Sequence, residues 1–143
     1  MDTDDLARFV EAQDSGGTYA RALEELRRGR KESHWMWFVF PQIAGLGHSA
    51  MAQRYAIADL DEAKRYLEHP VLGPRLRECV SAVAASRAAT AEEIFGGIDA
   101  MKLRSSLTLF MRAAPEERAF AELLERFFGG APDAATDQRL RGG

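Results

Sequence analysis

Apolar residues recur every three to four positions through most of the chain, in stretches that end at glycine or proline. The clearest stretch carries Leu72, Leu76, Val80 and Val83. This spacing predicts amphipathic helices. Glycine pairs at 16–17, 96–97 and 129–130 separate such stretches, and no segment alternates as a half-buried strand would. We therefore expect an all-α fold: a compact, irregular multi-helix single domain with short helices.

Several helix starts carry capping signals. Asp59-Leu-Asp-Glu62 and Thr90-Ala-Glu-Glu93 have the spacing of capping boxes, and Ser49 can cap a helix that follows it. A first predicted helix presents Leu6, Phe9 and Val10 and ends at residues 14–17. Further predicted helices cover about 18–28, 49–58, 59–68, 71–87, 90–97, 98–113 and 115–128. Residues 1–130 form the expected domain. Residues 131–143 are mostly small, polar or charged, so we expect them to form a loosely ordered tail.

Composition restricts the class of protein further. The chain of 143 residues fits one domain, and its net charge of −3 argues against the basic field that nucleic-acid binding requires. The single cysteine, Cys79, excludes an internal disulfide and suits a reducing cytoplasm. Cys79 shares the apolar stripe of its helix, so we expect it in the core. The longest apolar run, Trp35–Phe40, is too short to cross a membrane.

Residues 31–42 are the most distinctive segment, because they combine a lysine, a histidine, two tryptophans, two phenylalanines and a glutamine. We expect Ser33 to cap a short helix that Pro41 ends. A strand is the alternative, since aromatic and β-branched residues favour strands. Either the segment is a core helix buried on most sides, or Trp35 and Trp37 stack a planar ligand beside the polar groups of the segment. Each buried indole N–H needs an acceptor in either case.

Two further segments combine polar groups at helical positions. Residues 45–49, Gly-Leu-Gly-His-Ser, precede a helix, where exposed N–H groups can hold an anion; the alternative is a plain turn capped by Ser49. Asp99, Lys102 and Ser106 share one face of an otherwise apolar helix, with Ser105 beside them. They form either an internal ion pair with back-bonded serines or a ligand-facing stripe.

Other kinds of site are not indicated. The histidines are far apart in sequence, and neither H-x-x-x-H nor C-x-x-C occurs, so we predict no metal. G-x-S-x-G and the phosphate-binding glycine motifs are also missing from the sequence. We predict no cofactor.

Several strings together identify a family resemblance. RFVEAQ (8–13), GRKESHWMWFVFPQIAGLGHS (29–49), RYAI (54–57), YLEHPVLGPRL (66–76) and IFGGIDAMKLRSSLTLF (94–110) resemble the bacterial domain-of-unknown-function eighteen-ten family. Its members are often mislabelled calpastatin. The resemblance covers about residues 6–128 and implies a compact helical intracellular domain, with no catalytic residues to transfer. The order of motifs is also similar to the superfamily of NAD and ADP-ribose metabolism, whose signature residues are not clearly reproduced here.

These observations predict a cytoplasmic domain, possessing no membrane segment, that binds a small anionic metabolite of nucleotide or sugar-phosphate type. The alternative is a protein-interaction or regulatory module without enzymatic activity. The candidate catalytic residues are His34 and Asp99. The candidate ligand-binding residues are Lys31, Trp35, Trp37, Gln42, Gly45, Gly47, Ser49, Lys102, Ser105 and Ser106.

Overall fold

The helices of the fold follow the hydrophobic pattern closely. A computed structural model of the chain describes residues 3–142, with side chains from residue 6 onward. Its elements are α1 (Thr3–Asp14), the 3-10 turn η1 (Ser15–Gly17), α2 (Thr18–Arg27), α3 (Met36–Val39), α4 (Ala50–Arg54), α5 (Leu60–Glu68), α6 (Leu72–Ala85), α7 (Ala91–Ala113), α8 (Arg118–Phe128) and α9 (Ala134–Gly142). Extended pairing within these residues is limited to one isolated bridge between Ile43 and Ile57. The predicted all-α single domain is confirmed.

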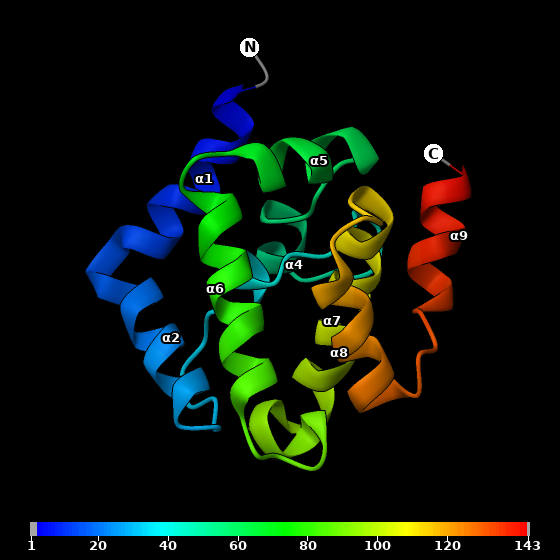
Figure 1. The fold of residues 1–143 in the computed structure, drawn as a ribbon. Coiled ribbons are helices and arrows are strands. Elements are labelled where there is room, and N and C mark those ends of the chain that lie inside the picture. Colours follow the sequence, from blue (N-terminus) through cyan, green and yellow to red (C-terminus); the bar gives the residue numbers. More distant parts are fainter. Residues whose placement is uncertain (1–2, 143) are drawn as a thin grey trace.

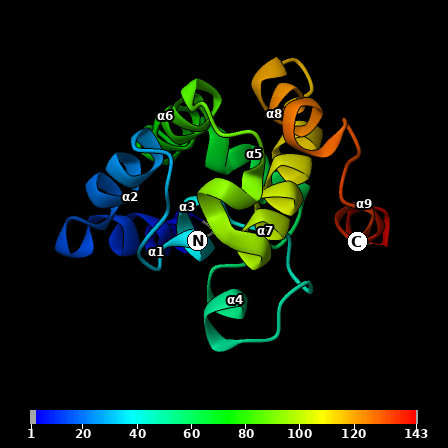
Figure 2. The same ribbon diagram turned by 90° about the horizontal axis from the view of Figure 1, so that it is seen from below.

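Helix α7 lies at the centre of the fold, where α5, α8 and α9 pack against it. Helix α6 packs against α2, α5 and α8, and α2 and α9 lie on opposite sides of the molecule (Figures 1 and 2). Aromatic rings connect the layers through the core. The Phe9 and Tyr66 centroids are 5.2 Å apart, Tyr66 and Phe110 are 5.3 Å apart, and Phe110 and Phe120 are 6.0 Å apart. Because these four rings come from α1, α5, α7 and α8, their contacts tie distant parts of the chain into one core.

The predicted capping residues hold the helix starts. Asp59, Thr90 and Ser49 each accept a hydrogen bond from the backbone N–H three residues later, at 2.9, 3.2 and 3.1 Å. The glutamate of each capping box reaches back to the residue before the cap: Ala58 N–H donates to Glu62 and Ala89 N–H donates to Glu93. These contacts satisfy backbone donors that a helix start leaves without partners.

Helix α7 bends sharply at Gly96. The sequence predicts two helices separated by Gly96-Gly97, and the structure joins them into one element whose backbone is non-helical at Gly96, with φ 79° and ψ 168°. That conformation is open essentially to glycine alone. We call residues 96–99 the α7 elbow. It orients the first turns of α7 independently of the rest and places Asp99 just after the bend.

Two expectations differ from the structure. Residues 36–39 are helical, as preferred over a strand, but the helix follows Trp35 and Ser33 does not cap it. The segment 131–143, expected to be loosely ordered, forms α9 over Ala134–Gly142 and packs against α7. Arg112 donates to both carboxylate oxygens of Asp137 at 2.9 Å, and this bidentate pair fixes α9.

No helix in residues 3–142 combines the length and apolar character needed to cross a membrane.

Candidate functional site

A buried carboxylate organises the loop that carries the first candidate segment. Glu25 of α2 is 2% exposed. It accepts hydrogen bonds from the N–H groups of Glu32 and Ser33 at 2.8 and 3.1 Å, from the Ser33 hydroxyl at 2.6 Å and from the Trp35 indole at 2.9 Å. Burial alone would raise the pKa of Glu25, but these donors outweigh it and lower that pKa to about 2. The loop is therefore built around an ionised carboxylate.

Glu25 also explains the orientation of Trp35. The indole N–H required an acceptor, and Glu25 supplies it inside the core, where Trp35 is fully buried. A ring with no exposed surface cannot stack a ligand that arrives from solvent, so the ligand-stacking role predicted for Trp35 has no support in this geometry. Trp35 instead anchors the segment to α2.

The second and more exposed feature is a cluster of charges around Asp99, the last residue of the α7 elbow. Lys31 Nζ lies 2.9 Å from one Asp99 oxygen, and Lys102 Nζ lies 3.6 Å from the other. The backbone N–H of Lys31 donates to the carbonyl of Ile94 at 2.7 Å, which fastens the loop to the first turns of α7. Two ammonium groups thus share one carboxylate, which leaves one positive charge in excess. We call Lys31, Asp99, Lys102 and Trp37 the Asp99 cluster.

Trp37 forms the aromatic part of this cluster. Its ring is partly exposed, and Lys102 Nζ lies 5.2 Å from its centroid, within cation–π range. Lys31 makes the corresponding contact with Trp35 at 5.0 Å. The two tryptophans therefore have different environments: Trp35 lies in the core and Trp37 is partly exposed at the surface. His34 is exposed nearby in sequence, but no contact links it to Asp99.

The glycine segment lies apart from the Asp99 cluster. Ser49 caps α4 and Gln42 uses its backbone carbonyl to accept from Ile57 N–H at 2.8 Å. Gly47 packs so close to α4 that an added Cβ would lie 2.6 Å from the Cβ of Ala52. Gly45 faces a separate cleft of about 740 Å³ beside α9, where Arg139 donates to its carbonyl at 3.1 Å. The segment therefore does not join the same site.

The two serines of α7 are also separated from the cluster. Ser105 donates to Asp133 at 3.1 Å, and Asp133 N–H donates to Thr108 at 2.8 Å, so these groups dock the start of α9. Ser106 is 1% exposed, and its hydroxyl has no hydrogen-bond partner among the described residues. Ser105 also donates to the Met101 carbonyl, one turn earlier in the helix, at 3.3 Å. Neither serine reaches solvent beside Asp99, so these contacts favour the alternative of an internal ion pair with a back-bonded serine over a ligand-facing stripe.

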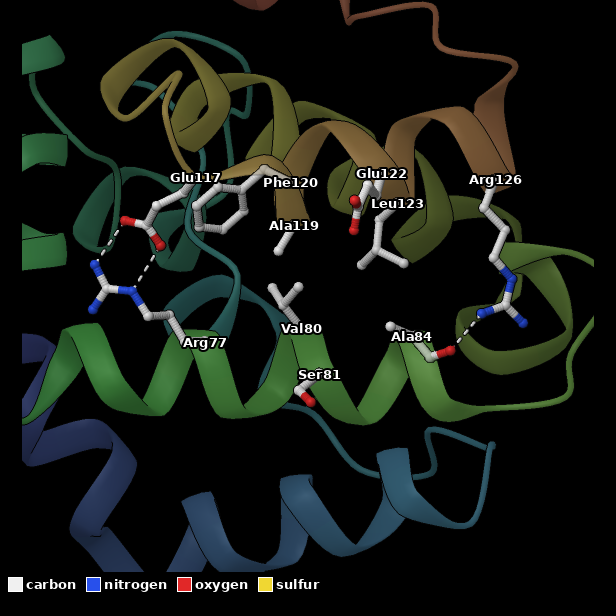
Figure 3. A pocket seen from close by; sticks show the side chains of 10 residues that line it. All are labelled: Arg77, Val80, Ser81, Ala84, Glu117, Ala119, Phe120, Glu122, Leu123 and Arg126. Atoms are coloured by element: carbon white, nitrogen blue, oxygen red, sulfur yellow. Dashed lines mark hydrogen bonds and ion pairs between the residues drawn. The ribbon is translucent and has the colours of Figure 1, made fainter.

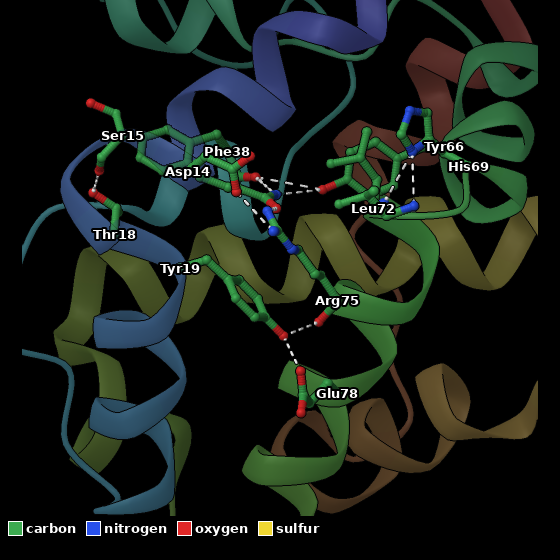
Figure 4. Close-up of polar contacts among 12 residues, drawn as sticks. Asp14, Ser15, Thr18, Tyr19, Phe38, Tyr66, His69, Leu72, Arg75 and Glu78 are labelled. Atoms are coloured by element: carbon green, nitrogen blue, oxygen red, sulfur yellow. Dashed lines mark hydrogen bonds and ion pairs between the residues drawn. The ribbon is translucent and has the colours of Figure 1, made fainter.

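A second buried network connects residues from two of the strings that mark the family resemblance, 8–13 and 66–76 (Figure 4). Gln13 is 1% exposed and donates to the Phe38 carbonyl at 2.7 Å and to Tyr66 at 3.3 Å. Arg75 donates to Gln13 at 3.2 Å, pairs with Asp14 at 2.8 Å, and lies over the Tyr19 ring. These residues join α1, α2, α5 and α6. Their contacts are internal, so the network serves the fold.

Cys79 lies in the core, as its place on the apolar stripe of its helix predicted. Cys79 is fully buried, and burial raises the pKa of its thiol to about 12, which keeps it protonated and unreactive. Among residues 3–142, no three His, Cys, Asp or Glu side chains are grouped so that they could hold a metal ion.

Comparison with known proteins identifies the family. A family model described as "Protein of unknown function (DUF1810)" matches residues 3–140. The crystal structure of the conserved hypothetical protein Rv1873 from Mycobacterium tuberculosis at 1.38 Å superimposes with a TM-score of 0.92 and 50% sequence identity, covering 96% of each chain. No curated protein matches. The chain therefore belongs to the DUF1810 family, a family whose function is unknown.

Proposed function

We propose that this protein binds a small anionic metabolite with a planar or sugar part, and that the Asp99 cluster is its binding site. One observation carries the proposal: Lys31 and Lys102, which are far apart in sequence, both contact Asp99 beside the partly exposed Trp37 ring. The excess positive charge attracts an anion, and the indole offers a stacking surface. Phosphate and aromatic groups together are the recognition features of nucleotides and related metabolites.

Lys102 is the ammonium group best placed to contact such an anion. Lys31 is only 8% exposed and donates to both Asp99 and the Ser33 carbonyl, the latter at 2.6 Å. Lys102 is 25% exposed, and its ion pair with Asp99 is long, at 3.6 Å. Its remaining donor capacity is therefore available to an incoming anion, while Lys31 holds Asp99 in place.

A thermal-shift screen over inorganic phosphate, ribose 5-phosphate, ADP, NAD and ADP-ribose tests the proposal. A ligand at a hundred times its dissociation constant stabilises the folded state by about 2.7 kcal/mol, which raises the melting temperature by several degrees. The Lys102→Gln variant should lose this shift, and the Lys64→Gln variant, which changes an exposed lysine of α5, should keep it. A well-folded protein that none of these ligands stabilises at millimolar concentration would falsify the proposal.

Fluorescence supplies an independent readout at the same site. The chain has two tryptophans, and only Trp37 has exposed surface. Ribose 5-phosphate and inorganic phosphate do not absorb where tryptophan is excited, so a change in emission on titration reports Trp37. The Trp37→Phe variant should abolish the change while Tm of the free protein remains close to that of the wild type.

A specific observation favours a second candidate, a protein-interaction module. Ile98 and Met101 are 76% and 71% exposed and stand one turn apart on α7, beside Asp99. Large apolar side chains this exposed mark interaction surfaces when they are contiguous. Changing both to serine should abolish recovery of a stoichiometric partner and leave the ligand-induced shift intact; the reverse pattern favours the metabolite site.

A further inference from the structure

A separate cavity of about 280 Å³ lies between α6 and α8 (Figure 3). Its walls are mostly apolar and come from Val80 and Ala84 on one helix and from Ala119, Phe120 and Leu123 on the other. This volume is close to the lower end of the range for small-molecule sites, about 300 Å³. No residue of the Asp99 cluster lines it, so any ligand here binds independently of the proposed function.

The arginines at the two ends of this cavity each make three hydrogen bonds within the protein. Arg77 donates to both oxygens of Glu117 at 2.8 Å and to the Leu67 carbonyl at 3.2 Å. Arg126 donates to the carbonyl groups of Ala84, Ser86 and Ala88 at 2.8, 2.7 and 3.0 Å, and so satisfies the last turn of α6. Both guanidinium groups therefore already have acceptors within the protein, and an anionic ligand would compete with these contacts.

Glu122 is the charged group of the cavity whose contact with the rest of the protein is weakest. Its ion pair with Arg118 measures 4.0 Å between two side chains that are 70% and 85% exposed, which makes it a weak contact. The Glu122 carboxylate points into the gap between the helices beside Leu123 (Figure 3). The cavity therefore combines apolar walls with one accessible negative charge and with two arginines that are already hydrogen-bonded to protein acceptors.

We propose that the cavity between α6 and α8 binds a small amine with an apolar body, whose ammonium group pairs with Glu122. Apolar walls favour an aryl or alkyl group, and the charge of Glu122 selects a cationic head group over a neutral or anionic one of the same size. The proposal requires no covalent step and no other component.

Three probes with one ring and different head groups test this charge preference: benzylamine, benzyl alcohol and benzoate. Binding is followed by NMR chemical-shift changes at the backbone amides of Ala84 and Ala119. Benzylamine should bind about fivefold more tightly than benzyl alcohol, which is the size of effect that a partly exposed ion pair supplies, and benzoate should bind most weakly.

Two variants separate the charge from the apolar walls. Glu122→Gln should reduce the affinity for benzylamine to that for benzyl alcohol, whereas Glu11→Gln, an exposed glutamate of α1, should change neither. Ala119→Leu should abolish binding of all three probes, because it fills the cavity from an exposed position that tolerates a larger side chain.

The proposal is overturned by any of four results. The first three are benzoate binding as tightly as benzylamine, a benzylamine preference that survives in Glu122→Gln, and no shift of the two amides with any probe at 10 mM. A concentration-dependent dimer that Ala119→Leu dissociates would assign the cavity to a second copy of the chain instead.

Discussion

Replacing Glu25 with glutamine tests how the first candidate segment is held in place. The Glu25 carboxylate accepts four hydrogen bonds in the core, and its pKa in the folded protein is about 2, compared with 4.5 for an ordinary glutamate. At 1.36 kcal/mol for each pH unit, this difference corresponds to about 3 kcal/mol of stability in the ionised state. Glutamine removes the negative charge and places an NH₂ donor where the surrounding groups are themselves donors. We therefore expect the substitution to destabilise the fold at pH 7 by about 3 kcal/mol.

The direction of the pH dependence follows from the lowered pKa. Folding favours the ionised form of Glu25. Its contribution to stability is therefore fully present above 4.5, the pKa of Glu25 in the unfolded chain, and is lost as the pH falls to about 2, its pKa in the folded protein. The difference in stability between wild type and Glu25→Gln should therefore be largest above pH 5 and shrink steadily between pH 5 and pH 2.

Urea unfolding, followed by circular dichroism at several pH values, measures this difference directly. Glu24→Gln is the matched control, because Glu24 is the preceding residue of α2 and its side chain is exposed. The control should change the free energy of unfolding by less than about 0.5 kcal/mol. The reasoning is refuted if Glu25→Gln is as stable as the control at pH 7, or if its stability declines with acid as steeply as that of the wild type.

Three further predictions concern the α7 elbow, the core thiol and α9. Gly96→Ala should destabilise the fold by about 1–3 kcal/mol in urea unfolding because of its φ of 79°, whereas Gly97→Ala should not; an added Cβ meets nothing within 4 Å at either position, so only the backbone differs. Cys79 should not react with a thiol reagent in the folded protein and should react stoichiometrically in urea, as a labelling time course will show. Asp137→Asn removes the bidentate pair with Arg112, so hydrogen exchange should accelerate in α9 and remain unchanged in α6.

The fold was largely predictable because its determinants are local. Apolar spacing, capping residues and glycine pairs act within a few positions, and α4, α5 and α7 begin directly after the capping residues Ser49, Asp59 and Thr90, as these signals indicate. The tail was harder to predict. Residues 134–142 have little apolar character, and their order depends on Asp137 meeting Arg112, a contact that no local pattern contains.

The candidate site was predictable only in part, since its geometry depends on long-range pairing. Helical spacing places Asp99, Lys102 and Ser106 on one face of α7, but it does not show which part of that face other helices cover. In the structure Ser106 lies in the core, whereas Asp99 stays at the surface. Glu25 was overlooked because it sits among charged neighbours and resembles part of a solvated face. The need of a buried indole for an acceptor was the available signal, and a carboxylate ten residues before Trp35 met that need.

The Asp99 carboxylate links these observations to function. It joins Lys31 of residues 31–42 to Lys102 of α7, and an anion that binds Lys102 must either displace it or use the positive charge left in excess. Displacement predicts that Asp99→Asn strengthens anion binding, because a competitor is removed. Use of the excess charge predicts that Asp99→Asn weakens binding, because Lys31 and Lys102 lose the carboxylate that holds them beside Trp37. The same substitution would leave an interaction surface made by Ile98 and Met101 largely unchanged, because these apolar side chains form no ion pair with the carboxylate. The sign of this effect therefore separates the ways in which the elbow can work.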